Sequence, residues 1–358
     1  MSRIPPEPLR GRGALSFPDN RFEKERREFV TDGNEGPSLD NRTRLIAETA
    51  RTIITENDSP DVGFSRSVNP YRGCEHGCIY CFARPSHAAV GLSPGLDFER
   101  TILFKKEAPR LLEGEISHKG YKAVPIALGI NTDAYQPVEE SLRITRGLLE
   151  VLDRASHPVT LVTKSSLIER DLDLLSSMAT RRLVHVYISL PTLDEGLSRR
   201  LEPRATTPLR RLETLKRLSL AGVPTGVLVA PVIPGLTCHE PESILERARE
   251  AGALSAGHIL LRLPLEVRDL FSEWLTHHFP GKAASVLSRL REYHGGKLYD
   301  ARFGVRMRGE GPLAELLSRR MEIAVRRLGF PGLPELDTDL FFPPVRKALS
   351  RLFPDFTP

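Results

Sequence analysis

The sequence predicts an α/β protein built on parallel strands, and three observations support this class. Apolar segments typical of buried strands alternate with longer segments in which apolar residues recur at helical spacing. This alternation begins near Arg44 and has the spacing that right-handed crossovers between parallel strands produce. Hydrophobic residues make up 40% and charged residues 27% of the 358 residues, as in soluble globular proteins. Both an α/β barrel and a doubly wound sheet fit the pattern.

The first strand is expected near Val68–Tyr71, directly before a loop that contains three cysteines. Short apolar runs, flanked by turn residues, predict the strands that follow. These further strands are Ala123–Ile130, Val159–Thr163, Leu183–Leu190, Val227–Ile233 and His258–Leu263.

Helices are expected between these strands, because capping and breaking residues mark their ends. Pro137 marks the first turn of one helix, and Pro208 follows a capping threonine in another, which ends at Gly222. A further helix runs from about Pro241 to Gly252. Apolar spacing alone predicts two more, one through Leu172, Leu175 and Met178 and one around Phe271 and Trp274.

The chain divides into three parts by composition. Residues 1–40 are rich in Pro, Gly and charge, so we expect an extended N-terminal arm with poor order of its own. Residues 41–265 carry the α/β pattern, and residues 266–358 form a helical C-terminal extension. No apolar run approaches the ~18 residues of a membrane span, and no secretory signal precedes the arm, so we expect a cytoplasmic protein.

The four cysteines predict a metal site. Cys74, Cys78 and Cys81 lie within eight residues, whereas Cys238 stands alone, and this is not the scattered even set of a disulfide framework. Three thiolates on one glycine-bearing loop can bind a single [4Fe–4S] cluster, which normally takes four. One iron would then remain open to a small molecule. The alternative is a non-enzymatic zinc- or iron-binding module, with a fourth zinc ligand from His76, His87 or Cys238.

The cysteine segment resembles the signature of the radical S-adenosylmethionine (SAM) superfamily. The spacing is Cys-x3-Cys-x2-Cys, with an aromatic residue before the last cysteine. The longer match resembles uncharacterised bacterial proteins related to spore photoproduct lyase (DNA repair photolyase-like), and it covers roughly residues 40–265. It rests on Asn69–Cys81, Thr132–Pro137, Thr163–Ser165 and Ala230–Leu236.

This resemblance implies a partial (β/α)6 barrel with the cluster loop after its first strand and a lateral mouth that the C-terminal helices narrow. It also implies that Cys74, Cys78 and Cys81 hold a [4Fe–4S] cluster whose open iron chelates SAM. Reductive cleavage of SAM would yield a 5′-deoxyadenosyl radical that abstracts hydrogen from an unidentified substrate. The electron would come from a donor such as flavodoxin or ferredoxin.

Several residues would position SAM if the resemblance holds. Tyr80 would lie against the adenine, or pack beneath the cluster. Asn131, Thr132 and Asp133 would hold the methionyl ammonium, although Asn-Thr-Asp is also a good capping sequence.

Two residues at strand ends would act on the other side of the cofactor. Lys164 ends an apolar strand, a costly place for an ammonium without an anion nearby, and the resemblance assigns it to the SAM carboxylate. A strand-end lysine that reaches solvent is the alternative. Ser189 would contact the cofactor. Cys238 is a candidate hydrogen donor, or a spare thiol.

The substrate is left open. Spore photoproduct lyase repairs a thymine dimer in DNA with a cysteine beside the second-strand loop, and residues 129–133 contain no cysteine here. A basic belt over residues 199–217 carries a net charge equal to the whole formal charge of the chain, +5. This belt suggests a nucleic-acid substrate and hence lyase-like repair, or else it is the solvated face of one helix.

Overall fold

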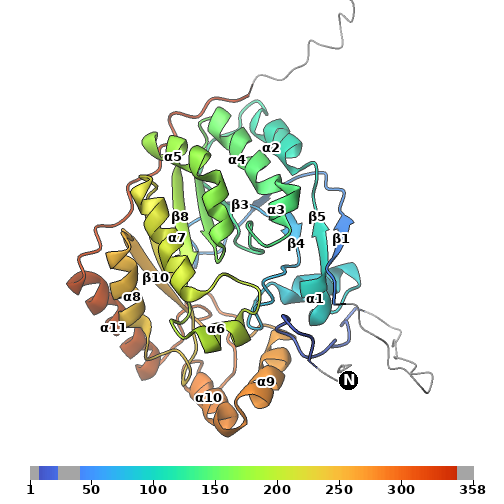
Figure 1. Cartoon of the computed structure of the whole chain (residues 1–358), viewed down its shortest axis with the longest axis vertical. Coiled ribbons are helices and arrows are strands. Elements are labelled where there is room, and N and C mark those ends of the chain that lie inside the picture. Colours follow the sequence, from blue (N-terminus) through green and yellow to red (C-terminus); the bar gives the residue numbers. More distant parts are fainter. Residues whose placement is uncertain (1–7, 23–40, 345–358) are drawn as a thin grey trace, which may run out of the picture.

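The fold is known from a computed structural model that describes residues 8–22 and 41–344. Its main sheet has the order β10-β9-β8-β7-β6-β3-β2 (Figure 1). Every pair from β3 through β10 is parallel, and β2 (Ile54–Glu56) is antiparallel to β3 at one edge. The parallel strands are β3 (Arg66–Val68), β6 (Ile126–Leu128), β7 (Val159–Thr163), β8 (Val184–Ser189), β9 (Thr225–Val232) and β10 (Ser255–Leu260).

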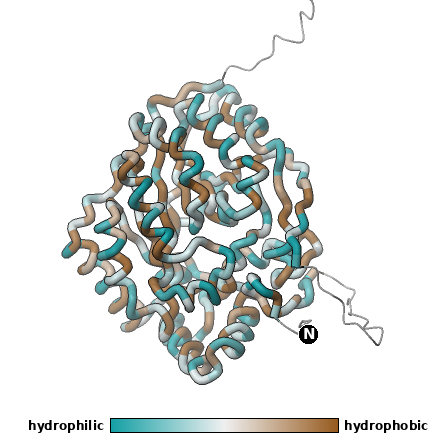
Figure 2. Tube along the Cα trace, in the orientation of Figure 1, coloured by the Kyte–Doolittle hydropathy of each residue, from teal (hydrophilic) through white to brown (hydrophobic). Residues whose placement is uncertain are grey.

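Six parallel strands with helical crossovers confirm the expected α/β fold. The helices α4 (Ile144–Arg154), α5 (Leu172–Thr180), α7 (Pro208–Leu220) and α8 (Pro241–Glu250) cover one face of the sheet (Figure 1). Apolar and hydrophilic residues alternate along these helices (Figure 2), as a helix with one buried side requires. The larger hydrophobic core lies between that buried side and the outward residues of the strands, such as Val186 and Val229.

The helix predicted after Pro137 is interrupted. It forms α3 (Glu139–Leu142) and α4, separated by Arg143, whose φ of 52° is left-handed. Short helices also precede or follow other strands. They are α6 (Glu195–Leu201) and the 3-10 helices η1 (Arg84–Val90) and η2 (Ser166–Asp171).

A small second sheet flanks the first strand of the barrel. It contains β1 (Arg44–Ala47), β5 (Thr101–Phe104) and β4 (Tyr71–Arg72) in that order, and α1 (Leu96–Arg100) leads into β5. The helix α2 (Ala108–Ile116) then packs against α4. The cysteine loop leaves β4, so this small sheet fixes where that loop begins.

The gap between the edge strands β2 and β10 is bridged by a loop, residues 302–308, rather than by the C-terminal helices. The N–H of Leu260 at the end of β10 donates to Met307 O at 2.8 Å. On the other side, Gly304 N donates to Asp61 in the β2–β3 hairpin at 2.5 Å. Arg306 forms an ion pair with the same carboxylate. The loop therefore connects the two edge strands of the sheet, β2 and β10.

Up to residue 344, the C-terminal part contains three helices followed by an extended tail. The helices α9 (Val267–His278) and α10 (Pro280–Glu292) pack together, and α11 (Pro312–Arg327) packs on α8. Residues 328–344 then run along the amino ends of the strands, where Asp337 N donates to Arg182 O and Phe342 N donates to Ala155 O. Residues 345–358 of the predicted helical extension lie outside the described residues.

The N-terminal arm differs from expectation. Residues 1–7 and 23–40 lie outside the described residues, but residues 8–22 pack against the cysteine loop. The low apolar periodicity of this segment gave no sign of this packing, because only a few apolar residues such as Ala14 and Phe17 are buried, and hydrogen bonds to distant residues such as Glu99 hold the rest. Among the described residues, no helix is both long enough and apolar enough to cross a membrane.

Candidate active site

The cysteine loop lies between β4 and η1, and tight turns shape it. Cys74 N donates to Phe98 O at 2.9 Å, and Cys81 N donates to Cys78 O at 3.1 Å. Gly77, between the first two cysteines, has a φ of 68°, and a Cβ there would meet the Glu99 carboxylate at 2.7 Å. A side chain at this position would therefore strain the backbone and clash with a buried acid.

The three cysteine side chains share one neighbourhood. Cys74 and Cys78 are only 6% and 8% exposed, Cys81 is half-buried, and all three are free thiols. Burial raises the pKa of Cys74, and the negative charges of Asp133, Cys78 and Cys81 raise it further. Three buried thiolates would repel one another, so the thiols can ionise together only around a cationic group such as a metal centre. The donor set therefore fits an iron–sulfur cluster.

A mononuclear zinc site is not formed by the described residues, among which no three His, Cys, Asp or Glu side chains converge on one ion. Zinc ligands lie within about 2.3 Å of a single metal, whereas the thiolates of a cluster each bind a different iron and stand farther apart. His87 is buried with Nε2 2.9 Å from Thr101 O. Cys238 Sγ accepts from Gly235 N at 3.3 Å. His87 Nε2 and Cys238 Sγ thus have other partners, whereas His87 Nδ1 is buried without one among the described residues.

His76, the third proposed zinc ligand, is only 2% exposed, although it lies inside the cysteine loop. Its Nδ1 is 3.3 Å from a carboxylate oxygen of Asp133. This contact connects the cysteine loop to the loop after β6.

Lys164 lies at the end of β7 beside a buried cluster of charged side chains. Burial alone would lower the pKa of Lys164, but the Cys78 thiolate and the Glu202 carboxylate outweigh it and raise the pKa. Glu202 forms an ion pair with Arg211 of α7, and both are almost fully buried. Lys164 therefore keeps its proton despite its burial.

Tyr80 contacts the same cluster of charges. Its hydroxyl donates to Glu202, and its ring lies in a second hydrophobic core with Cys78 and Ile79. Packing beneath the cysteines thus describes the Tyr80 side chain, and contact between its backbone and adenine stays a prediction.

Asp133 makes more contacts than a simple ligand for an ammonium. One oxygen accepts from Thr163 Oγ1 at 2.7 Å and from Tyr135 N at 2.9 Å, and the other accepts from Lys164 N at 2.8 Å. Burial alone would raise the pKa of Asp133, but the charge and hydrogen bond of His76, together with the other donors, lower it to about 2. Asp133 therefore stays ionised and joins the loops after β6 and β7.

The other residues predicted to contact the cofactor differ in whether their side chains already have hydrogen-bond partners within the protein. The Thr132 hydroxyl donates to Tyr71 O at 2.9 Å, and the Ser189 hydroxyl donates to Ala230 O at 3.2 Å. Both residues are buried. Asn131 is half-buried, and its main-chain N–H donates to Asn69 Oδ1 at 3.1 Å. Within the described chain, the side-chain amide of Asn131 has no hydrogen-bond partner. Among these three residues, Asn131 therefore has the side chain most available to a ligand.

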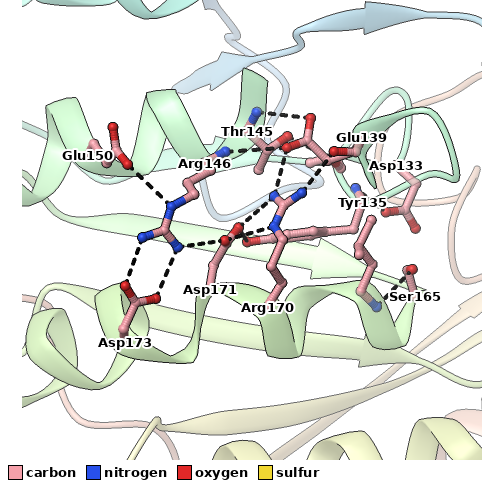
Figure 3. Close-up of polar contacts among 12 residues, drawn as sticks. Asp133, Tyr135, Glu139, Thr145, Arg146, Glu150, Ser165, Arg170, Asp171 and Asp173 are labelled. Carbon is pink, nitrogen blue, oxygen red and sulfur yellow. Dashed lines mark hydrogen bonds and ion pairs between the residues drawn. The ribbon is translucent and has the colours of Figure 1, made fainter. Parts of the chain in front are cut away.

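A network of charged side chains lies next to the loop after β6 (Figure 3). Arg170 donates to Glu139 at 2.9 Å and to Asp171 at 2.9 Å, and both carboxylates have no exposed side-chain area. Tyr135, two residues after Asp133, donates to Asp171 at 3.1 Å. Arg146 donates to Asp171 as well, at 3.0 Å. Sequence reasoning missed this network, because in a chain rich in charge nothing distinguishes a buried carboxylate from an exposed one.

Two further charges that sequence reasoning missed hold the cysteine loop. Arg84 is fully buried and donates to Cys78 O at 3.0 Å and Gly77 O at 3.2 Å. It also forms a 2.5 Å ion pair with Glu99, which is equally buried. The one feature of the sequence that could have indicated a role for Arg84 is its position three residues after Cys81.

Most of the predicted basic belt is paired with acids. Arg211 is buried against Glu202, and Arg204 lies 3.0 Å from Glu75. Arg210 and Arg217 share Glu169, at 2.6 Å and 3.1 Å. These pairs make the belt resemble the charged surface of a folded domain more than an open site for phosphates.

Comparisons with known proteins indicate the family of the chain. Residues 68–248 match the model of the radical SAM superfamily. An uncharacterized protein of Mycobacterium tuberculosis is 34% identical over 233 residues, which cover 64% of this chain and 67% of the relative. An uncharacterized protein of Methanocaldococcus jannaschii is 26% identical over 198 residues, covering 55% of this chain and 71% of the relative.

Solved structures resemble the chain in fold. Spore photoproduct lyase in complex with dinucleoside spore photoproduct has a TM-score of 0.58 and 13% identity, with 86% of each chain covered. A cysteine-to-serine mutant of that lyase has a TM-score of 0.55 and 15% identity, with 80% of each chain covered. At such low identity the likeness concerns the fold alone. The family match covers half of the sequence and contains the cysteine loop, so the chain belongs to the radical SAM superfamily.

Proposed function

We propose that this protein is a radical SAM enzyme that binds a [4Fe–4S] cluster through Cys74, Cys78 and Cys81 and uses SAM to abstract hydrogen from a substrate. The observation that carries the proposal is the grouping of three free thiols, two of them buried, on one loop at the carboxyl ends of the barrel strands. The cluster supplies one electron for reductive cleavage of SAM when both are bound.

The chain's own residues have binding and positioning roles in this proposal. Lys164, directly after β7, would offer its protonated ammonium to the SAM carboxylate. Asn131, on the neighbouring loop, is held by its main-chain N–H and offers its unpaired side-chain amide to a ligand. Asp133 holds the main chain of Lys164 in place through a 2.8 Å hydrogen bond. Asn131, Asp133 and Lys164 are each partly buried, which limits the access of water to the chemistry.

Single replacements of Cys74, Cys78 or Cys81 by alanine test the proposal, with Cys238→Ala as the matched control. After anaerobic reconstitution, iron and sulfide per chain should fall sharply in the three variants and stay unchanged in the control. Formation of 5′-deoxyadenosine under dithionite should follow the iron content. A wild-type chain that takes up zinc in place of iron and sulfide would overturn the proposal in favour of a metal-binding module.

A nucleic-acid substrate is the second candidate, and one structural feature favours it. Phe82, directly after Cys81, is 39% exposed, and the Arg262 guanidinium lies 5.0 Å from its ring centroid. An exposed aromatic ring paired with arginine is a common platform for unpaired bases. The basic belt adds little support, because most of its arginines are paired. Oligonucleotide binding that weakens with salt and in Phe82→Ala would support this candidate, and no binding at low salt would exclude it.

The proposed chemistry also requires an electron donor, such as flavodoxin or ferredoxin. Reduction of the reconstituted protein by either, followed through 5′-deoxyadenosine release, tests this partner.

A further inference from the structure

Residues 11–20, here called the strap, cross the cysteine loop, and residues 12–17 and 20 of the strap are buried. Ser16 O accepts from Leu96 N at 3.1 Å, and the Ser16 hydroxyl donates to Glu273 of α9 at 2.6 Å. Asn20 donates to Ala88 O of η1 at 2.9 Å. The strap thus contacts the elements on both sides of the loop.

The main chains of the strap and the loop lie close together at Gly13. A Cβ at Gly13 would lie 1.9 Å from Gly77 O and 3.4 Å from Ile79 N. Gly77 and Ile79 flank Cys78. No residue larger than glycine can occupy position 13 unless the strap lifts from the loop, because the obstacle is backbone that is itself fixed.

One buried ion pair holds the strap and the loop together. The Glu99 carboxylate accepts from Gly13 N and from Ala14 N, both at 2.8 Å. Its ion-pair partner, Arg84, donates to the carbonyls of Gly77 and Cys78. The acid therefore binds the strap and the base binds the loop. Removal of either partner would leave a buried charge without its counter-ion.

The strap also contributes apolar contacts beneath the cysteines. Ala14 and Phe17 belong to the same buried core as Cys78, Ile79 and Tyr80. Helices α9 and α10 contribute to the same core, through residues such as Trp274 and Leu290. The strap, the loop and the C-terminal helices therefore share one apolar core.

We propose that the strap is a structural part of the cluster site, which sets the geometry of the Cys78 region and slows loss of the cluster. The inference rests on the proposed function, since it assumes that the three cysteines bind a cluster. Gly13, Glu99 and Arg84 are its positioning residues. A loop held only by its own turns would release iron faster, because local opening would expose the thiolates to water and oxidant.

The variant Gly13→Ala tests the strap, with Gly114→Ala as the matched control, since a Cβ at Gly114 meets nothing within 4 Å. Both proteins are reconstituted anaerobically and then exposed to a chelator or to air. Loss of the cluster absorbance should be several-fold faster in Gly13→Ala than in wild type or control, while circular dichroism shows an unchanged fold. Equal rates of loss would overturn the inference and leave the proposed function intact.

Hydrogen exchange in the wild-type chain provides a second measurement that needs no variant. Reconstitution should slow exchange at Gly13 and Ala14, whose amides bind Glu99, relative to the apoprotein. Unchanged exchange in the strap, in a protein shown to contain iron and sulfide, would also overturn the inference. Failure of the wild type to take up any cluster would instead contradict the proposed function.

Discussion

The carboxylate of Asp133, in the loop after β6, accepts a 2.8 Å hydrogen bond from the main-chain N–H of Lys164 at the end of β7. The same carboxylate accepts from the Thr163 hydroxyl at 2.7 Å. A single acid with little exposed side-chain area thus joins two loops that we propose contact SAM. Asp133 contributes to the site by placing Lys164 as well as through its own charge.

Asp133→Asn should weaken both stability and SAM binding. The amide nitrogen would face an N–H or O–H donor on one side of the carboxyl group, leaving buried donors unpaired at a cost of about 1–3 kcal/mol. Thermal unfolding and calorimetric titration with SAM measure the two effects. Thr163→Val removes the hydrogen bonds of the Thr163 hydroxyl to Asp133 and from Ser165 N, and it leaves Lys164 N bonded to Asp133, so it should lower stability with little change in affinity. Equal loss of affinity in the two variants would contradict the positioning role.

Lys164→Ala should weaken SAM binding by about 1–3 kcal/mol, the scale of one hydrogen bond to a charged group. Lys216→Ala, at an exposed position on α7, is the control and should bind SAM like wild type. Calorimetric titration of the reconstituted proteins measures both. An unchanged affinity in Lys164→Ala would remove this residue from the site.

Asp61→Asn should loosen the bridge across the edge of the sheet. Hydrogen bonds from Gly304 N and Arg306 lower the pKa of Asp61, so the carboxylate is ionised at neutral pH and binds both. Proteolysis within residues 295–311 should accelerate in this variant. Asp58→Asn, in the same hairpin, is the control. The interpretation fails if both variants are cut at the wild-type rate.

Stability should fall as the pH drops below about 6.5, in part through His157. Burial lowers the pKa of His157 to about 4, and Tyr121 and Pro158 O bind its two ring nitrogens at 2.9 Å each. The unfolded chain takes up the proton first, so this stabilisation is complete above pH 6.5 and is lost progressively down to pH 4. The full effect is about 3 kcal/mol.

Thermal unfolding between pH 7.5 and 5 measures this dependence. His157→Gln should have a smaller slope against pH than wild type, whereas His118→Gln, at an exposed position, should have the same slope. Some slope should remain in His157→Gln, because burial also lowers the pKa of His87 to about 4. A slope identical to wild type in His157→Gln would contradict the assignment.

Local patterns predicted most of the barrel correctly. The strand Val159–Thr163 agrees with β7 at both ends, and the helix expected from Pro208 to Gly222 corresponds to α7. Both depend on residues close in sequence, namely β-branched runs and helix-capping residues. The break at Arg143 was not predicted, because its left-handed φ is imposed by packing rather than by the residue's own preference.

The sequence by itself determined the class of the protein, since the spacing of Cys74, Cys78 and Cys81 and the alternation of strands and helices are local properties of the chain. Only the tertiary structure decided which charges are buried and which distant segments meet. Glu99 binds Gly13 across more than eighty residues, and Glu202 neutralises Arg211 inside the site. Burial and long-range pairing depend on how the whole chain packs, and no short stretch of residues encodes them.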